Sequence, residues 1–181
     1  MRIITGIYKG RHFDVPRTFK ARPTTDFAKE NIFNVLNGYV DFEGATALDL
    51  FSGTGSITLE LLSRGCSTVV SVEADRDHAH FIRQCVTKLG TEKNVLIRGD
   101  VFRFLKSCRQ KFDFIFADPP YALPHLETIP SLVFERDLLN AGGIFVFEHG
   151  KQNDFSTHPH FLEHRAYGSV NFSLFGIGMK E

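Results

Sequence analysis

The sequence predicts an α/β protein built on a doubly wound, mostly parallel sheet with helices on both faces. Between residues 46 and 148, strand-like and helix-like segments alternate, as they do when crossover helices join parallel strands. The strand-like segments are apolar runs such as 112–117, which are typical of strands buried on both faces. After residue 160 two strand candidates flank Tyr167, Gly168 and Ser169, which predicts a closing antiparallel hairpin.

The elements follow in order along the chain. Residues 1–22 are short and strand-like with breaks at Gly6 and Gly10, and 23–37 form an N-terminal helical region that Thr25 or Asp26 caps. Its apolar side is expected to hold Phe27, Ile32, Phe33 and Leu36. The expected strands are 46–50, 68–73, 95–98, 112–118, 144–148, 162–166 and 170–175. The expected helices between them are 56–63, 75–89, 101–108 and 127–139.

Composition favours one packed domain, 1–181, in which 1–22 form a short appendage. The chain has 181 residues, and 43% of them are hydrophobic, which is enough for a sizeable core. Basic and acidic residues balance at 21 each, so net charge gives no argument for a nucleic-acid partner. The first 22 residues differ, because six basic residues face one acid there and give a local charge of +5. This basic arm is a candidate RNA-binding segment, or alternatively a solvated face.

Three cysteines at wide spacing indicate neither a zinc site nor a disulfide framework, and they fit a reducing compartment. His158, His160 and His164 are loosely clustered, but they lack nearby cysteines or a trio of carboxylates, so we expect surface histidines and no metal. We find no run of apolar residues long enough for a signal peptide or a membrane span. A cytoplasmic protein is expected.

The tetrapeptide Asp118-Pro119-Pro120-Tyr121 follows the apolar run 112–117, where a strand opens into a loop. Two prolines fix the backbone and remove two N–H donors. Asp118 and the Pro119 carbonyl are then two acceptors held in one geometry, and Tyr121 offers a flat ring for stacking. These features suit a planar group that carries an exocyclic amine. The alternative is a turn that only ends the strand.

A second set of candidates begins with a glycine-rich turn between a predicted strand and a predicted helix. Gly53 and Gly55 belong to a Gly-x-Gly-x-x-Thr pattern that lacks the third glycine of the dinucleotide fingerprint and the lysine of a phosphate loop, which lowers NAD and ATP as candidates. Glu73 ends the next strand, where a carboxylate can accept from both hydroxyls of a ribose. Asp100 ends the third strand and could accept from an adenine amine, cap the next helix, or do both.

All these candidates fall at the carboxyl ends of successive predicted strands, which meet at one edge of a parallel sheet. The full set resembles the class I S-adenosylmethionine-dependent methyltransferases, which have a Rossmann-like fold, and Asp-Pro-Pro-Tyr is similar to the motif of their amino-methylating branch. The N-terminal residues closely resemble those of the RsmD family. The residues that carry this resemblance are Arg2-Ile3-Ile4, Gly6, Gly10-Arg11, Arg22-Pro23-Thr24-Thr25-Asp26, Glu30 and Phe33-Asn34.

The resemblance covers nearly the whole chain and implies methylation of the N2 amine of a guanine in bacterial 16S rRNA. It implies S-adenosyl-L-methionine as cofactor and no metal. Cofactor contacts are expected at Asp49, Phe51, Gly53, Gly55, Glu73, Asp100 and Val101. Catalytic contacts are expected at Asp118, Pro119 and Tyr121. RNA contacts are expected from Arg11, Arg17, Lys20 and Arg22. Because the chain is neutral overall, we expect it to act on rRNA within an assembled small ribosomal subunit and not on naked RNA. A monomer is expected.

Two other functions stay open on the sequence. The tetrapeptide also fits methylation of adenine N6 in DNA or RNA, whereas a protein-glutamine substrate is disfavoured because that branch resembles Asn-Pro-Pro-Tyr and position 118 is aspartate. A non-catalytic RNA-binding assembly factor on the same fold would require a damaged cofactor pocket. Gly53, Gly55, Glu73 and Asp118 are all present, which argues against this alternative.

Overall fold

Seven strands form one sheet in the order β3-β2-β1-β4-β5-β7-β6, in a computed structural model that describes residues 1–177. The strands are β1 (Thr46–Leu50), β2 (Thr68–Glu73), β3 (Asn94–Arg98), β4 (Phe112–Ala117), β5 (Leu139–His149), β6 (Phe161–Tyr167) and β7 (Val170–Gly176). The first five run parallel, while β7 pairs antiparallel with both β5 and β6. The predicted doubly wound sheet with a C-terminal hairpin is therefore confirmed, and its strand order reverses between β1 and β4.

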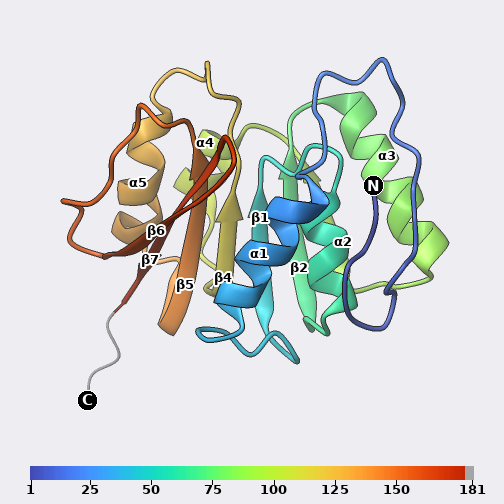
Figure 1. The fold of residues 1–181 in the computed structure, drawn as a ribbon, viewed down its shortest axis with the longest axis horizontal. Helices are drawn as coiled ribbons and strands as arrows, with labels where there is room; N and C mark the ends of the chain where they lie inside the picture. Colours follow the sequence, from blue (N-terminus) through green and yellow to red (C-terminus); the bar gives the residue numbers. More distant parts are fainter. Residues whose placement is uncertain (178–181) are drawn as a thin grey trace.

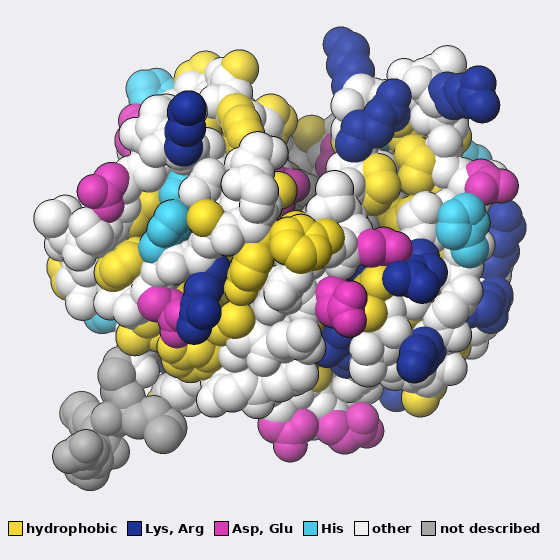
Figure 2. Space-filling model, in the orientation of Figure 1, with side chains coloured by type: hydrophobic (Ala, Val, Ile, Leu, Met, Phe, Trp, Pro, Cys, Tyr) yellow, Lys and Arg dark blue, Asp and Glu magenta, His cyan; other side chains and the backbone are white. Residues whose placement is uncertain are grey.

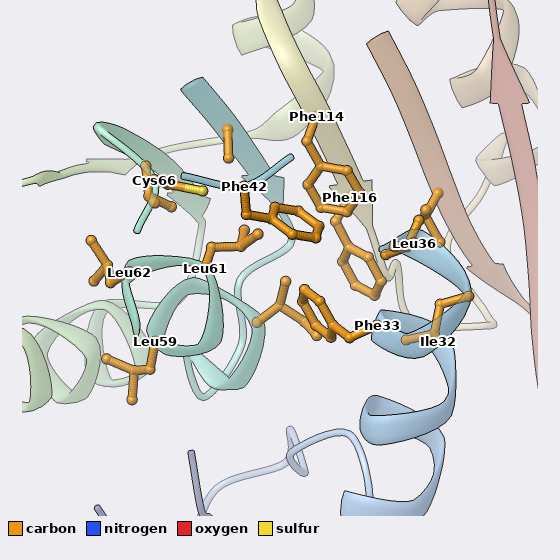
Figure 3. Packing of buried hydrophobic residues seen from close by; sticks show 14 of the residues in the cluster. Ile32, Phe33, Leu36, Phe42, Leu59, Leu61, Leu62, Cys66, Phe114 and Phe116 are labelled. Carbon is orange, nitrogen blue, oxygen red and sulfur yellow. The ribbon is translucent and has the colours of Figure 1, made fainter. Parts of the chain in front are cut away.

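Helices cover both faces of this sheet (Figure 1). They are α1 (Asp26–Leu36), α2 (Ser56–Ser63), α3 (Arg76–Leu89), α4 (Val101–Ser107) and α5 (Ile129–Glu135), with the 3-10 turn η1 (Leu126–Thr128) before α5. The first three pack on one face and the last two on the other, so the buried apolar side chains form two clusters. On the first face, Phe33 of α1 lies against Phe42, which packs edge-on against Phe114 of β4 (Figure 3).

Local sequence explains where the helices begin and end. Thr25 caps α1, because its hydroxyl accepts from the Ala28 N–H at 3.2 Å. Asp75 caps α3 through two backbone N–H groups, and Gly90 ends that helix in the left-handed conformation. Phe27 was predicted to lie on the apolar side of α1, but it stays outside the core. It is 62% exposed and packs edge-on against Tyr167.

The predicted helix 127–139 is wrong at its C-terminal end. Asp137 has φ of 55°, and the Leu138 N–H donates to the Val133 carbonyl at 3.2 Å, a Schellman motif that ends α5. Leu139 then begins β5 instead of continuing the helix. Within the described part of the chain, 1–177, no helix is long and apolar enough to cross a membrane.

The N-terminal segment 1–22 is not a strand, and the prediction of strand-like structure there is also wrong. It contains one isolated bridge, between Arg2 and His12, and is otherwise irregular. Some of its backbone groups bond within the segment, as the Ile3 N–H does to the Arg11 carbonyl, and others bond to α2. The carboxylate of Glu60 accepts from the Ile4 and Thr5 N–H groups at 2.9 and 3.1 Å, and the Ser63 hydroxyl accepts from the Tyr8 N–H at 3.0 Å.

Glu60 also joins α1 to α2. It is fully buried and lies 3.5 Å from the ammonium of Lys29, which is 1% exposed. Arg64, one turn further along α2, donates to Glu60 at 2.9 Å and lies over the ring of Phe33. Burial lowers the pKa of Lys29, although Glu60 opposes the shift. One carboxylate therefore neutralises two buried cations and anchors the N-terminal segment.

We predict that Glu60→Ala destabilises the protein by about 3–5 kcal/mol, because it leaves buried cations and two backbone donors unpaired. Urea unfolding followed by circular dichroism measures this loss. The control is Glu30→Ala on the exposed side of α1, which we expect to change stability by less than about 0.5 kcal/mol. Equal effects of the two substitutions would contradict the role of Glu60.

Candidate active site

A cavity of about 780 Å³ opens at the carboxyl ends of β1, β2 and β4, where the strand order reverses. Figure 2 shows this upper edge of the molecule as hollowed, with lysine and arginine side chains on one rim. The predicted residues that line the cavity are Asp49, Phe51, Gly53, Glu73, Asp100, Val101, Asp118, Pro119 and Tyr121, together with Lys20 and Arg22. Gly55, Arg11 and Arg17 do not line it. A second hollow, beside Tyr39 and Arg64, holds none of the predicted site residues.

The turn after β1 is held open by left-handed backbone. Phe51 has φ of 59°, a conformation that costs a non-glycine residue about 1–2 kcal/mol. Gly53 and Gly55 follow with φ of 58° and 83°. A Cβ at Gly55 would lie 3.0 Å from the side chain of Ile82 in α3, so glycine there lets α2 begin close to α3. Gly55 therefore shapes the turn from outside the cavity.

Glu73 binds the same turn from β2. Its Oε1 accepts the Gly53 N–H at 2.7 Å, and its Oε2 accepts the Asp75 N–H at 2.8 Å. The residue is 8% exposed, at the wall of the cavity. Each carboxylate oxygen has two lone pairs, so Glu73 keeps acceptor capacity for a ligand while it positions the glycine turn.

Asp49 lies beneath the turn and is almost fully buried. It accepts from the Thr58 hydroxyl at 2.7 Å, and burial raises its pKa to about 7, with smaller contributions from Asp118 and Glu73. Asp100 begins α4, and its Oδ2 accepts the Arg103 N–H at 2.9 Å. Its predicted capping role is confirmed, and the residue also lines the cavity.

The tetrapeptide forms the opposite wall. Asp118 comes directly after β4 and is partly accessible from the cavity, while Tyr121 is 47% exposed. Burial, Glu148 and Asp118 together raise the pKa of Tyr121 to about 12, so its hydroxyl stays protonated. Burial and the adjacent Glu148 raise the pKa of Asp118 well above its usual value.

Glu148 was not among the predicted site residues. It lies in the apolar stretch Ile144–His149 of β5, and an isolated acid in such a stretch is the one sequence signal that could have revealed it. Burial raises its pKa as well. Of the three histidines that we expected at the surface, His164 is exposed, whereas the other two are partly buried. His160 stacks on Phe134, and His158 lies near the Ser131 hydroxyl.

The basic arm has structural contacts of its own. All four predicted RNA-binding side chains are exposed. Arg11 donates to the Lys88 carbonyl at 3.1 Å, and Arg22 donates to the Phe19 carbonyl at 2.6 Å. No side-chain hydrogen bond or ion pair links Arg17 or Lys20 to the rest of the described chain. Two of the four side chains are thus free to contact a ligand.

Comparison with known proteins places the chain in a family. Residues 1–176 match the model of the family described as conserved hypothetical protein 95, the RsmD family. The chain belongs to this family. It is 30% identical to ribosomal RNA small subunit methyltransferase D of Haemophilus influenzae, over 97% of this chain and 93% of that protein. The protein of that name from Buchnera aphidicola is 29% identical, over 97% and 91%.

The fold agrees with this assignment. The solved structure of the Escherichia coli protein yhhF superposes with a TM-score of 0.86 at 26% identity, covering 99% of each chain. The sheet, with its antiparallel C-terminal strands, is that of the class I methyltransferases, as the sequence predicts.

The buried acid Asp49 makes stability depend on pH. Its pKa is about 7 in the folded protein and 3.8 in the unfolded chain, so folding favours the protonated acid. At pH values well below 4 both the folded and the unfolded state hold the proton, so the buried carboxyl group carries no charge penalty. The penalty for burying the ionised group grows as the pH rises toward 7. We predict that the stability difference between Asp49→Asn and the wild type shifts in favour of the variant by up to roughly 4 kcal/mol between pH 4 and pH 8.

Urea unfolding of both proteins across this pH range measures the shift. The amide that Asp49→Asn introduces preserves an acceptor for the Thr58 hydroxyl, so that hydrogen bond does not confound the comparison. A stability difference that stays constant with pH would show that the buried carboxyl group titrates normally.

Proposed function

We propose that this protein transfers a methyl group from S-adenosylmethionine to the N2 amine of a guanine in bacterial 16S rRNA, within an assembled small ribosomal subunit. The observation that carries the proposal is that Asp118-Pro119-Pro120-Tyr121 and the glycine turn held by Glu73 line the same cavity. A cofactor site and a site for a planar amine would thus be adjacent. The RsmD-family relatives named above as small-subunit rRNA methyltransferases support the choice of substrate.

The acidic lining and the exposed backbone of the cavity support S-adenosylmethionine as its ligand. Asp49, Glu73, Asp100 and Asp118 contribute acidic groups to its wall, which suit a ligand with a sulfonium and an ammonium group. Glu73 would hold the ribose hydroxyls, and the exposed backbone at Phe51 and Gly53 would let the ligand approach closely. When bound, S-adenosylmethionine supplies an electrophilic methyl group on a positively charged sulfur.

The tetrapeptide would hold the acceptor. Asp118 and the Pro119 carbonyl accept the two N–H groups of the amine, and Tyr121 stacks on the base. The amine nitrogen forms a bond to the methyl carbon as the carbon–sulfur bond breaks and its electron pair returns to sulfur. The nitrogen then loses one proton to solvent, because the raised pKa of Asp118 disfavours the ionised carboxylate that could otherwise accept it. A base must leave any helix or stack to reach this site.

Nucleoside mass spectrometry of rRNA from cells with and without the gene tests the proposal. We expect N2-methylguanosine at one position of 16S rRNA to disappear on deletion and to return when the purified protein treats isolated small subunits. Loss of N6-methyladenosine instead would identify an adenine methyltransferase. Unchanged rRNA, together with no binding of S-adenosylmethionine in calorimetry, would indicate a non-catalytic assembly factor.

Substitution of Glu73 tests the cofactor site. We predict that Glu73→Ala weakens S-adenosylmethionine binding by roughly 10- to 150-fold, the cost of losing a charged hydrogen-bond partner. Calorimetry measures affinity, and thermal unfolding checks that the turn at Gly53 survives. Asp77→Ala, an exposed acid in the first turn of α3, is the control and should bind normally. Unchanged affinity in Glu73→Ala would contradict the role of Glu73 in cofactor binding, and its role would then be limited to its hydrogen bonds with Gly53 and Asp75.

Asp118→Ala should slow single-turnover methylation by about 10²–10³-fold and leave cofactor affinity unchanged, because Asp118 contacts the amine and its bond tightens in the transition state. Asp118→Asn keeps an acceptor and should lose less. Tyr121→Phe keeps the ring and should be mild, whereas Tyr121→Ala should be severe. Methylation by Asp118→Ala near the wild-type rate would reduce the tetrapeptide to a turn that ends β4.

The arm should contribute RNA affinity. Replacing Arg17 and Lys20 by glutamine should reduce the salt dependence of RNA binding by about 2 units in log–log slope, and replacing all four basic residues by roughly 3–4. Filter binding at several salt concentrations measures the slope. The matched control replaces Lys106 and Arg109, exposed residues near α4 on the other face of the sheet. If neither set of substitutions changes the slope, the basic arm is a solvated face that makes no contact with RNA phosphates.

A further inference from the structure

Glu148 is a buried acid beside the proposed acceptor site to which the proposed mechanism gives no role. Ala117 of β4 pairs with Phe147 of β5, so Asp118 and Glu148 are the next residues on two neighbouring parallel strands. Phe116 and Val146, two positions earlier, both belong to the core on the α1 face. Because side chains alternate along a strand, Asp118 and Glu148 point to this same face.

The carboxylate of Glu148 lacks the partners that a buried acid needs. The residue is 8% exposed, and its Oε1 is buried. No donor from the described residues reaches that atom. Buried acceptors without a partner are rare, because leaving one unpaired costs free energy. Such an atom next to a binding cavity marks a place where a ligand can supply the missing donor.

Guanine has donors that match two adjacent carboxylates. Its N1–H lies directly beside its N2 amine on the Watson–Crick edge, the edge that enzymes read on an extruded base. We propose that Glu148 selects guanine: when the N2 amine lies against Asp118, the Glu148 carboxylate accepts the N1–H of the same base. This inference rests on the proposed function and adds a specificity-determining residue to it.

The same arrangement would reject adenine. In adenine the atom beside the exocyclic amine is an unprotonated N1, whose lone pair would face the Glu148 carboxylate. Both would then be acceptors, and a buried group would be left unpaired, which is the condition under which sites discriminate most strongly between similar ligands. The tetrapeptide alone binds an amine of either base, so discrimination needs a further residue beside Asp118.

The test uses an analogue that lacks the N1 proton that Glu148 would read. In 2-aminopurine the N2 amine is kept, but N1 is unprotonated and the 6-oxygen is missing. The rRNA is ligated with guanine or 2-aminopurine at the nucleotide that mass spectrometry has identified, and is then assembled into small subunits. Single-turnover rates are compared for the wild type, Glu148→Gln and the control Glu92→Gln, an exposed residue between α3 and β3.

We expect the wild type and Glu92→Gln to prefer guanine by at least about 100-fold. Glu148→Gln should slow guanine methylation at least about tenfold and lower the preference at least about tenfold, because its amide can donate to the unprotonated N1. An unchanged preference in Glu148→Gln overturns the inference alone. If that variant does not fold, equal wild-type rates on the two bases overturn it, and a preference for guanine supports it. No N2-methylguanosine at all overturns the proposed function and this inference together.

Discussion

Four carboxyl groups lie close together at one edge of a parallel sheet, and the architecture of the cavity depends on the contacts that reduce the repulsion between them. Parallel strands end at the same edge, so Asp49, Glu73, Asp118 and Glu148 come together from β1, β2, β4 and β5. The fold lowers their mutual repulsion by three means. Glu73 accepts backbone N–H groups, Asp49 accepts a hydroxyl, and burial beside Glu148 raises the pKa of Asp118, which favours its neutral form. A cationic ligand would reduce the remaining repulsion. The same repulsion that destabilises the empty cavity would therefore favour binding of such a ligand.

The N-terminal part of the chain forms the other wall of the cavity, and Glu60 attaches it to α2. Its carboxylate receives the backbone of Ile4 and Thr5 and neutralises Lys29 of α1. Because Pro23 and Thr24, just before α1, line the cavity, this buried ion pair positions the cavity rim from a distance. The arm is therefore part of the folded domain and also the part of it that carries the exposed basic groups.

Elements determined by neighbouring residues could be predicted from sequence, and elements determined by distant residues could not. The bounds of β1, α2 and β2 match because apolar runs, a glycine turn and Glu73 mark them locally. The segment 1–22 was mispredicted because part of its backbone bonds to Glu60 and Ser63, which lie more than fifty residues away. Glu148 was missed for a similar reason: its significance comes from the register of β4 against β5, which no local pattern encodes. The end of α5 was also missed, because Asp137 adopts the left-handed conformation that ends the helix although it is not the glycine that usually marks such an end in a sequence.

The last strand of the sheet also affects what the protein can associate with. β6 is an edge strand, and an edge offers unpaired backbone groups to other chains. Here three consecutive positions are Glu163, His164 and Arg165, and the Glu163 carboxylate accepts from both Tyr39 and Arg165. Any strand added at this edge would have to displace these contacts and desolvate the charges. The hairpin thus terminates sheet growth at β6 and protects this edge of the sheet from self-association.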